Sequence, residues 1–306
     1  MNQTYLDTAR LLTQVAPLVF ADDTFALKGG TAINLFIRDI PRLSVDLDLV
    51  FRDHTLSRDV ALDRINAALR QSAERLNELR LETRLQKSPN NIESKLFVRR
   101  LGIEVKIEVN LVMRGTIHPV RASALTSTAR DLLLAELTLP VLSLEDLYGG
   151  KLVAAMDRQH PRDLFDVMQL FEHEGITPGI RRAFVVYLAS HNRPVHEVLF
   201  PNPRDTKLEL EYERSFKGMT IVSAELAALQ AARTRMCQEL QDGLDEEERD
   251  FLISLVEGHP QWQKLGIAHL EALPGVRWKL QNLQQLKNER PRKFAEQVQL
   301  LTQRLR

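Results

Sequence analysis

The sequence predicts an α+β protein in which a small mixed sheet with helices precedes an all-helical region. Two segments of the first half, SVDLDLVF (44–51) and IEVKIEVNLV (103–112), alternate between apolar and polar residues, as strands with one buried face do. From residue 143 onwards, apolar residues recur at helical spacing instead. We therefore expect two domains, residues 1–142 around the sheet and residues 143–306 made of helices.

The remaining elements follow from periodicity and from residues that break helices. Pro41 ends a short helix because it lacks an N–H and clashes with the preceding turn. Ser143, with Asp146 three residues later, resembles a capping box that opens a helix. We expect helices at 5–20, 31–38, 57–79 and 144–158, after Pro161, near Ile180 and across 221–305, with further strands at 24–27, 81–86 and 94–100.

Composition indicates an ordinary globular chain, with 44% apolar residues and equal numbers, 41 each, of basic and acidic residues. No apolar run approaches the roughly 18 residues needed to span a membrane, and the N-terminus lacks a secretory signal pattern. The single Cys237 excludes an internal disulfide and a cysteine zinc cluster. We expect a cytoplasmic protein without a membrane partner.

The aspartate strand carries the first candidate site. Asp46 and Asp48 are two residues apart, so their side chains leave the same face of a strand. Two carboxylates placed in this way can share Mg²⁺ or Mn²⁺, hard cations that prefer oxygen ligands and substrate phosphates. Alternating acids also occur on exposed strands that bind nothing, so this pair alone does not decide the matter.

A glycine turn precedes the aspartate strand. Lys28-Gly29-Gly30-Thr31 lies between a short strand and a helix, where backbone N–H groups and the helix dipole favour a phosphate. Lys28 would offset phosphate charge, and the Thr31 hydroxyl would donate to the same group. The alternative is a plain turn in which glycine relieves strain.

A third carboxylate comes from the later strand. Glu108 lies on its polar face and would complete the metal site, or orient and deprotonate an attacking hydroxyl. Glu104 is the competing residue. The alternative for either is a surface acid that pairs with Lys106.

This combination, G-G-T, fourteen residues, D-x-D and a later acid, resembles the DNA polymerase β-type nucleotidyltransferase superfamily over residues 24–112. A closer resemblance, to the AbiEii/AbiGii family of nucleotidyltransferase toxins, spans nearly the whole chain. It rests on LKGGTAINLF (27–36), RLSVDLDLV (42–50), EDLYGGKLVAAMDRQHPRDLFDV (145–167) and LPGVRWKLQNL (273–283).

The resemblance implies a magnesium-dependent enzyme that transfers a nucleoside monophosphate from an NTP to an RNA acceptor. Related MenT-like toxins extend the tRNA 3′ end, which would block translation. It also implies abortive infection (phage defence) or a type IV toxin–antitoxin system, with a cognate antitoxin protein as partner. Two other functions stay open: transfer of the nucleotide to a protein hydroxyl, and nucleotide binding without turnover.

Later family motifs map onto the first helices of the second half. Lys151 and Arg158 lie on one helix face, where they would bind triphosphate oxygens. Asp163 and Asp166, three residues apart, would orient Lys151 or the nucleotide, and the sequence does not decide which aspartate acts. The alternative is a buried ion-pair network.

Two further features concern regulation and RNA. In some relatives a serine at the position of Ser44 is phosphorylated, and a phosphate there would repel an incoming triphosphate. Residues 277–306 hold eight basic and two acidic residues, a net charge of +6, and would contact RNA phosphates. Residues 242–257 hold seven acidic residues and one basic residue, a net of −6, and could instead pair with that basic segment.

Overall fold

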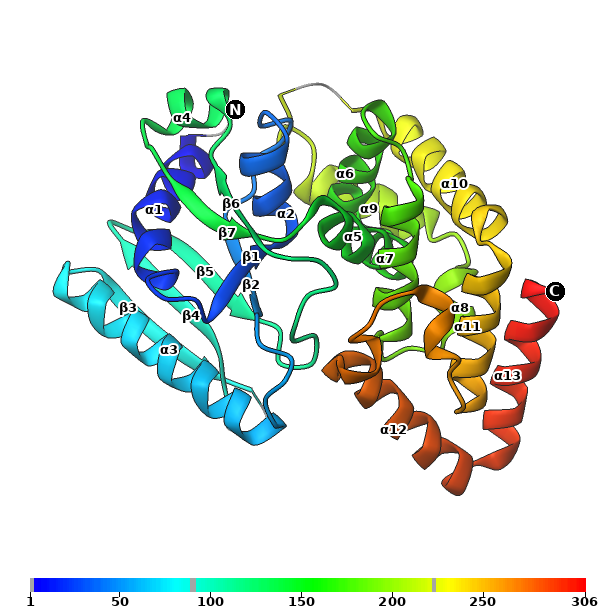
Figure 1. The fold of residues 1–306 in the computed structure, drawn as a ribbon. Helices are drawn as coiled ribbons and strands as arrows, with labels where there is room; N and C mark the ends of the chain where they lie inside the picture. The colour runs from blue at the N-terminus through cyan, green and yellow to red at the C-terminus, as the bar shows by residue number, and fades with distance from the viewer. Residues whose placement is uncertain (1–2, 89–91, 222–223) are drawn as a thin grey trace. The chain divides into compact units, whose positions relative to one another are not determined.

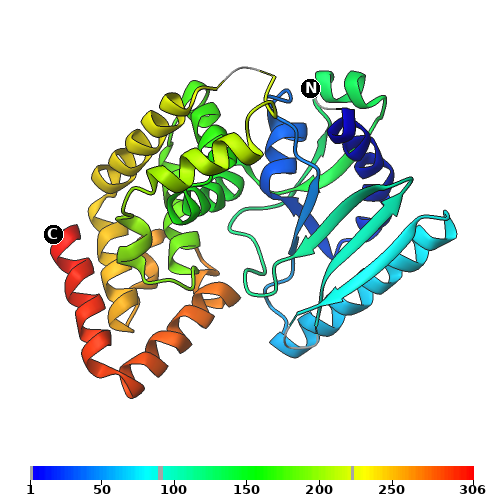
Figure 2. The same cartoon turned by 180° about the vertical axis from the view of Figure 1, so that it is seen from behind.

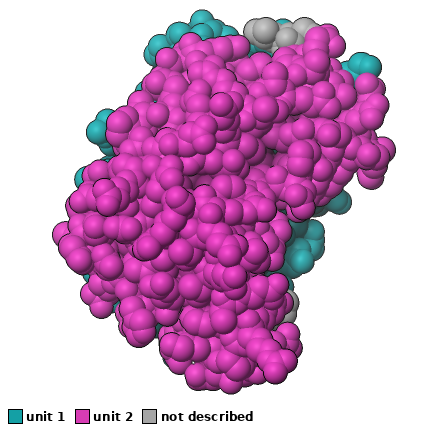
Figure 3. All heavy atoms as spheres, turned by 90° about the vertical axis from the view of Figure 1, so that its right-hand side faces the viewer, with its two compact units in different colours: residues 1–147, 217–223 teal, residues 148–216, 224–306 magenta. Residues whose placement is uncertain are grey.

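The structure, a computed structural model, describes residues 3–88, 92–221 and 224–306. Its contacts divide the chain into two compact units. The first comprises Met1–Leu147 and Lys217–Ser223, and the second comprises Tyr148–Phe216 and Ala224–Arg306 (Figure 3). The division falls within one helix, after Leu147, and each unit is described by itself.

A seven-stranded mixed sheet organises the first unit, with strand order β3-β4-β5-β2-β1-β7-β6 (Figure 1). The two central pairs differ in direction: β2 runs parallel to β5 and antiparallel to β1. The strands are β1 (Phe25–Lys28), β2 (Asp46–Phe51), β3 (Glu82–Lys87), β4 (Glu93–Arg100), β5 (Ile103–Val109), β6 (Arg121–Ala124) and β7 (Thr138–Val141). The helices are α1 (Gln3–Val19), α2 (Gly29–Ala32), α3 (Arg58–Glu78) and α4 (Ser127–Leu133).

One face of this sheet is the hydrophobic core. Helix α1 packs on β2 and β5, and α3 packs on β3 and β4, while the alternating apolar residues of β2 and β5 are buried beneath them. Because side chains alternate along a strand, the polar residues of β2 and β5 leave the opposite face. Figure 2 looks onto that face, with the strands in front of α1 and α3. The predicted α+β class is confirmed, and β2 and β5 each bury one face and turn polar residues to the other.

Local departures from the predicted elements occur around the glycine turn. The expected helix at 31–38 begins at Gly29 as α2 and continues as a π-helix, Ile33–Ile37. The aspartate strand starts at Asp46 rather than at Ser44. Ser44 therefore lies outside the strand ladder, in the segment that leads from Pro41 into β2.

A distant segment completes the edge of this region. Thr220 forms an antiparallel bridge with Arg42, and the Leu43 and Ile221 N–H groups donate to the carbonyls of Met219 and Pro41. These bonds explain why Lys217–Ser223 belongs to the first unit. Helical periodicity across 143–306 does not predict this return.

The second unit consists of helices. They are α5 (Leu144–Arg158, which begins in the first unit), α6 (Pro161–Glu172), α7 (Pro178–Ala189), α8 (Val195–Leu199), α9 (Asp205–Ser215), α10 (Leu226–Gly243), α11 (Glu246–Glu257), α12 (Pro274–Glu289) and α13 (Pro291–Leu305), with short 3-10 turns at Trp262–Leu265 and Leu270–Ala272. No helix in the described part of the chain is long and apolar enough to cross a membrane.

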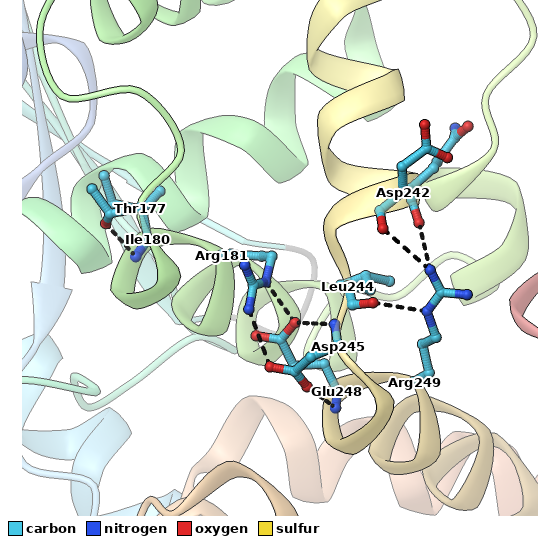
Figure 4. A network of polar contacts seen from close by, with 9 residues as sticks. Thr177, Ile180, Arg181, Asp242, Leu244, Asp245, Glu248 and Arg249 are labelled. Atoms are coloured by element: carbon cyan, nitrogen blue, oxygen red, sulfur yellow. Dashed lines mark hydrogen bonds and ion pairs between the residues drawn. The ribbon is translucent and has the colours of Figure 1, made fainter.

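The acidic segment 242–257 bonds to other helices of this unit, through Arg181 from outside the segment and through its own Arg249 (Figure 4). Arg181 on α7 bonds to Glu248 at 2.7 Å and to Asp245 at 3.1 Å. Asp245 and Glu248 also form the capping box of α11. Arg249 donates to the Leu305 carbonyl, so the start of α11 fixes both α7 and the end of α13.

Candidate active site

The polar face of the sheet aligns the predicted residues in one row. Asp48 is the register partner of Lys28 on β1 and of Glu108 on β5, and Glu108 is in turn the partner of Lys95 on β4. Asp46 lies two residues before Asp48 on β2, on the same face, and its side chain is 42% exposed. The structure thus brings both aspartates, Glu108 and Lys28 together on neighbouring strands.

The glycine turn lies directly against the second aspartate. Gly29 has a φ of +77°, a conformation that glycine adopts without strain. A methyl group added at Gly29 would lie 2.3 Å from Oδ2 of Asp48. The turn therefore requires glycine for its backbone and for the space that the carboxylate occupies.

The second glycine lies against two other polar groups. A methyl group at Gly30 would lie 2.7 Å from Nη2 of Arg42 and 2.9 Å from Oγ of Ser44. The Thr31 hydroxyl lies 2.5 Å from the Asp46 carbonyl oxygen and 3.1 Å from Ser44 Oγ. Thr31 is 1% exposed, and its hydroxyl joins the turn to the aspartate strand by donating to the Asp46 carbonyl. Its donation to a phosphate stays a prediction.

Two lysines neutralise the carboxylates of this face. Lys106 Nζ lies 3.1 Å from Glu108 and 3.7 Å from Asp46, and Lys95 Nζ lies 3.2 Å from Glu108. Burial acts to raise the pKa of Glu108, but the two ammonium groups outweigh it and lower that pKa. Burial acts to lower the pKa of Lys106, but Asp46 and Glu108 outweigh it and raise that pKa. Both shifts favour the charged forms, the ammonium of Lys106 and the carboxylate of Glu108.

These residues fit part of a metal site. Asp46 and Asp48 offer hard oxygen ligands on one half-exposed face, and the glycine at position 29 leaves room for the Asp48 carboxylate. Across residues 3–88, 92–221 and 224–306, however, no three His, Cys, Asp or Glu side chains are grouped to hold a metal. Glu108, which faces the two lysines, does not join the aspartates in such a group.

The later predicted residues form a buried network in the second unit. Lys151 Nζ lies 2.8 Å from Asp166 and 3.0 Å from Asp163, and all three side chains are at most 7% exposed. Arg158, which is 60% exposed, bonds to Asp163 at 2.9 Å. Burial acts to raise the pKa of Asp163, but Lys151 and Arg158 outweigh it and lower that pKa. The alternative of a buried ion-pair network describes these contacts.

Sequence reasoning missed several residues of the polar face. Arg42, 3% exposed and next to Gly30, lies in the RLSVDLDLV stretch but carries no pattern of its own. The sequence gives no reason to place Lys95 at the site, and it indicates Lys106 only as the partner of Glu108 if Glu108 is an ordinary surface acid. The alternation of β5 places Lys106 and Glu108 on one face, so Lys106 is the residue of the three that the sequence could have assigned to this face.

Comparison with known families identifies the family of the chain. The model of the family described as "Nucleotidyl transferase AbiEii toxin, Type IV TA system" matches residues 10–282. The chain belongs to this AbiEii family. It is therefore a nucleotidyltransferase of the toxin type, as the resemblance to this family implied. Membership implies an NTP substrate and an antitoxin partner.

A solved structure shares the fold of this AbiEii-family chain. It is MenT4, the nucleotidyltransferase toxin Rv2826c from Mycobacterium tuberculosis H37Rv, with a TM-score of 0.59 and 19% identity over 91% of this chain and 94% of that one. At this identity the likeness establishes the α+β fold of both units and no more. No curated protein matches the chain.

Proposed function

We propose that this enzyme transfers a nucleoside monophosphate from an NTP to the 3′ end of an RNA, tRNA being the acceptor, and thereby blocks translation. The carrying observation is the placement of Asp46 and Asp48 on one face with Gly29 against the Asp48 carboxylate. This arrangement sets acidic oxygens beside a bend whose backbone can approach a polyphosphate.

The reaction makes one bond and breaks one. The acceptor hydroxyl oxygen bonds to the α-phosphorus, the bond from that phosphorus to the bridging oxygen breaks, and pyrophosphate leaves. Asp46 and Asp48 would hold Mg²⁺ or Mn²⁺, which supplies positive charge to the triphosphate. Lys28, the register partner of Asp48, adds positive charge on the neighbouring strand.

Glu108 takes a different role in this scheme from that of a metal ligand or base. Burial acts to raise the pKa of Glu108, but Lys106 and Lys95 outweigh burial and lower that pKa. A more acidic carboxyl group is a weaker proton acceptor. We infer that Glu108 positions Lys95 and Lys106 through its two ion pairs. The hydroxyl proton then passes to water.

The biological setting follows the same proposal. We infer a cytoplasmic toxin restrained by a cognate antitoxin, within a type IV toxin–antitoxin or abortive-infection system. A phosphate on Ser44 would add about two negative charges next to Gly30 and Thr31, where a triphosphate would lie. Such a modification would inactivate the enzyme.

The acceptor is tested by incubating purified protein with labelled NTPs, Mg²⁺ and tRNA. We expect labelled RNA with wild type and a loss of at least about 1,000-fold with Asp46→Asn, because the metal carboxylate is removed. Asp59→Asn is the matched control, since the Asp59 side chain is 92% exposed on α3. Label on protein with none on tRNA would show that the acceptor is wrong, and no label anywhere would refute transfer.

A further inference from the structure

The carboxylates of β2 and β5 already share a cation that belongs to the protein. Lys106 Nζ lies 3.7 Å from Oδ2 of Asp46 and 3.1 Å from Oε2 of Glu108, so one ammonium group bridges the two strands. In polymerase-type two-metal sites, divalent ions occupy the space between such carboxylates. Lys106 thus stands where a metal ion would be expected.

Glu108 has both oxygens engaged. Oε1 faces Lys95 at 3.2 Å and Oε2 faces Lys106 at 3.1 Å. A metal ion that bound to Glu108 would have to displace at least one ammonium group. This agrees with the lack, among the described residues, of any metal-binding group of three acidic, His or Cys side chains.

The strand register keeps Lys106 beside Asp46. Its register partners are Asp46 on β2 and Phe97 on β4, and the Phe97 ring is covered by the guanidinium of Arg84 at 4.1 Å. On the β4 side Lys106 therefore faces an aromatic ring that already has a cation over it. Its carboxylate contacts are with Asp46 and Glu108.

The charges of this face already balance. Among the residues around the two aspartates, the carboxylates Asp46, Asp48 and Glu108 give −3 and the lysines Lys28, Lys95 and Lys106 give +3, a sum of zero. Arg42 and Glu104, which also lie near this face, add one charge of each sign and leave the sum unchanged. A second divalent ion would therefore bind to a face whose negative charge is neutralised. One ion held by Asp46 and Asp48, whose side chains are only partly buried, is compatible with this balance.

We propose that Lys106 takes the place of one of the two divalent ions of a polymerase β-type site, so that this enzyme binds a single divalent ion through Asp46 and Asp48. Glu108 is then a positioning residue for Lys106 and not a metal ligand. The inference rests on the proposed function, because it assumes that the two aspartates hold a metal.

The test is a titration of the full chain with Mn²⁺ alone, in which electron paramagnetic resonance reports free Mn²⁺. Wild type should bind one ion. In Lys106→Met, a second ion should bind at least about 10-fold more tightly than any second ion binds to wild type, because a unit charge a few ångströms away has been removed. Adding Glu108→Gln to Lys106→Met should abolish that gain.

Three matched variants separate Lys106 from general charge. Lys95→Met removes an equal charge from the other oxygen of Glu108 and should leave one ion. Lys106→Arg keeps the charge and should also leave one ion. Glu108→Gln in the wild-type background should not weaken the first ion. Thermal unfolding by circular dichroism confirms that each variant folds.

Several outcomes would overturn the proposal. They are two ions of similar affinity in wild type, an unchanged titration in Lys106→Met, an equal gain in Lys95→Met, or a first ion lost in Glu108→Gln. Failure of the proposed function gives a different result: wild type and Asp46→Asn would bind Mn²⁺ equally or not at all, which removes the metal site itself.

Discussion

The two units each join lysine to a pair of carboxylates, but in different surroundings. On the sheet face, Lys106 contacts Asp46 and Glu108 with side chains that are 32–42% exposed. In the helical unit, Lys151 contacts Asp163 and Asp166 with side chains that are at most 7% exposed. Water can replace the partners of the first group but not those of the second. The same residue types are therefore accessible to water in one unit and enclosed in the other.

The largest expected difference between the two groups is in stability. Lys151→Met leaves two buried carboxylates without their ammonium partner and should cost about 3–5 kcal/mol of unfolding free energy. Lys106→Met should cost less than about 1 kcal/mol, because its carboxylates stay hydrated. Urea unfolding of both variants measures the difference, and similar losses would show that burial does not separate the groups.

The second prediction concerns the glycine against Asp48. Gly29→Ala should reduce nucleotide transfer about 100-fold, because the new methyl group would displace the carboxylate that we assign to the metal. Gly102→Ala is the matched control: Gly102 has a φ of +79° and nothing within 4 Å of an added methyl group. It should cost only backbone strain, about 1 kcal/mol, and leave activity unchanged. Equal transfer activity in Gly29→Ala and Gly102→Ala would contradict the assignment of Asp48 to the metal.

A third lysine, Lys279, can be compared with Lys106 and Lys151. It is buried like Lys151, but its hydrogen-bond acceptors are backbone carbonyl oxygens instead of carboxylates. Lys279 on α12 is 3% exposed and donates to the carbonyls of His191 and Arg193, just beyond the end of α7. Burial lowers the pKa of Lys279 to about 8, and Glu197 acts in the opposite direction. Lys279 is therefore not available to RNA phosphates, unlike the exposed Arg277 beside it.

Lys279 makes stability depend on pH. Below pH 8 both the folded and the unfolded chain hold the proton. Between about pH 8 and the ordinary value of 10.5, the unfolded chain keeps the proton that the folded chain has lost, so stability rises with pH. Between pH 7.5 and 9.5, the unfolding free energy of wild type relative to Lys279→Met should rise by about 2 kcal/mol. A flat or falling difference would show that Lys279 stays protonated when buried.

The smallest expected effect concerns the exposed member of the helical network. Arg158→Gln should leave the melting temperature nearly unchanged, because Lys151 remains next to Asp163. If Arg158 contacts the triphosphate, as the family resemblance implied, the KM for NTP should rise about 10-fold, the loss of one charge-assisted pair. Arg182→Gln, which changes an exposed arginine on α7, provides the control. Equal KM values in the two variants would show that Arg158 does not contact the triphosphate.

Much of the sheet face could be predicted from the sequence, because alternation along β2 and β5 fixes which side chains share a face. It correctly grouped Asp46 with Asp48 and placed Lys106 with Glu108. Alternation does not give the register between strands, which depends on long-range pairing. The contact between Lys106 and Asp46 therefore became visible only in the structure.

The helical unit was less predictable for a different reason. The spacing of Asp163 and Asp166 correctly indicated a shared helix face that meets Lys151. Whether that face is buried depends on the packing of neighbouring helices, which sequence periodicity does not specify. The acidic segment shows the same limit, since its partner Arg181 lies more than 60 residues earlier in the chain.

The return of residues 217–221 to Pro41, Arg42 and Leu43 has a consequence for synthesis. Domains form as the ribosome releases them, and those nearer the N-terminus usually form first. Here residues 41–43, which lead to Ser44 and the aspartate strand, gain the hydrogen bonds from residues 219–221 only after helices α5 to α9 have been translated. A nascent or prematurely ended chain therefore lacks part of the edge next to the proposed nucleotide site, and toxic activity should appear late in translation.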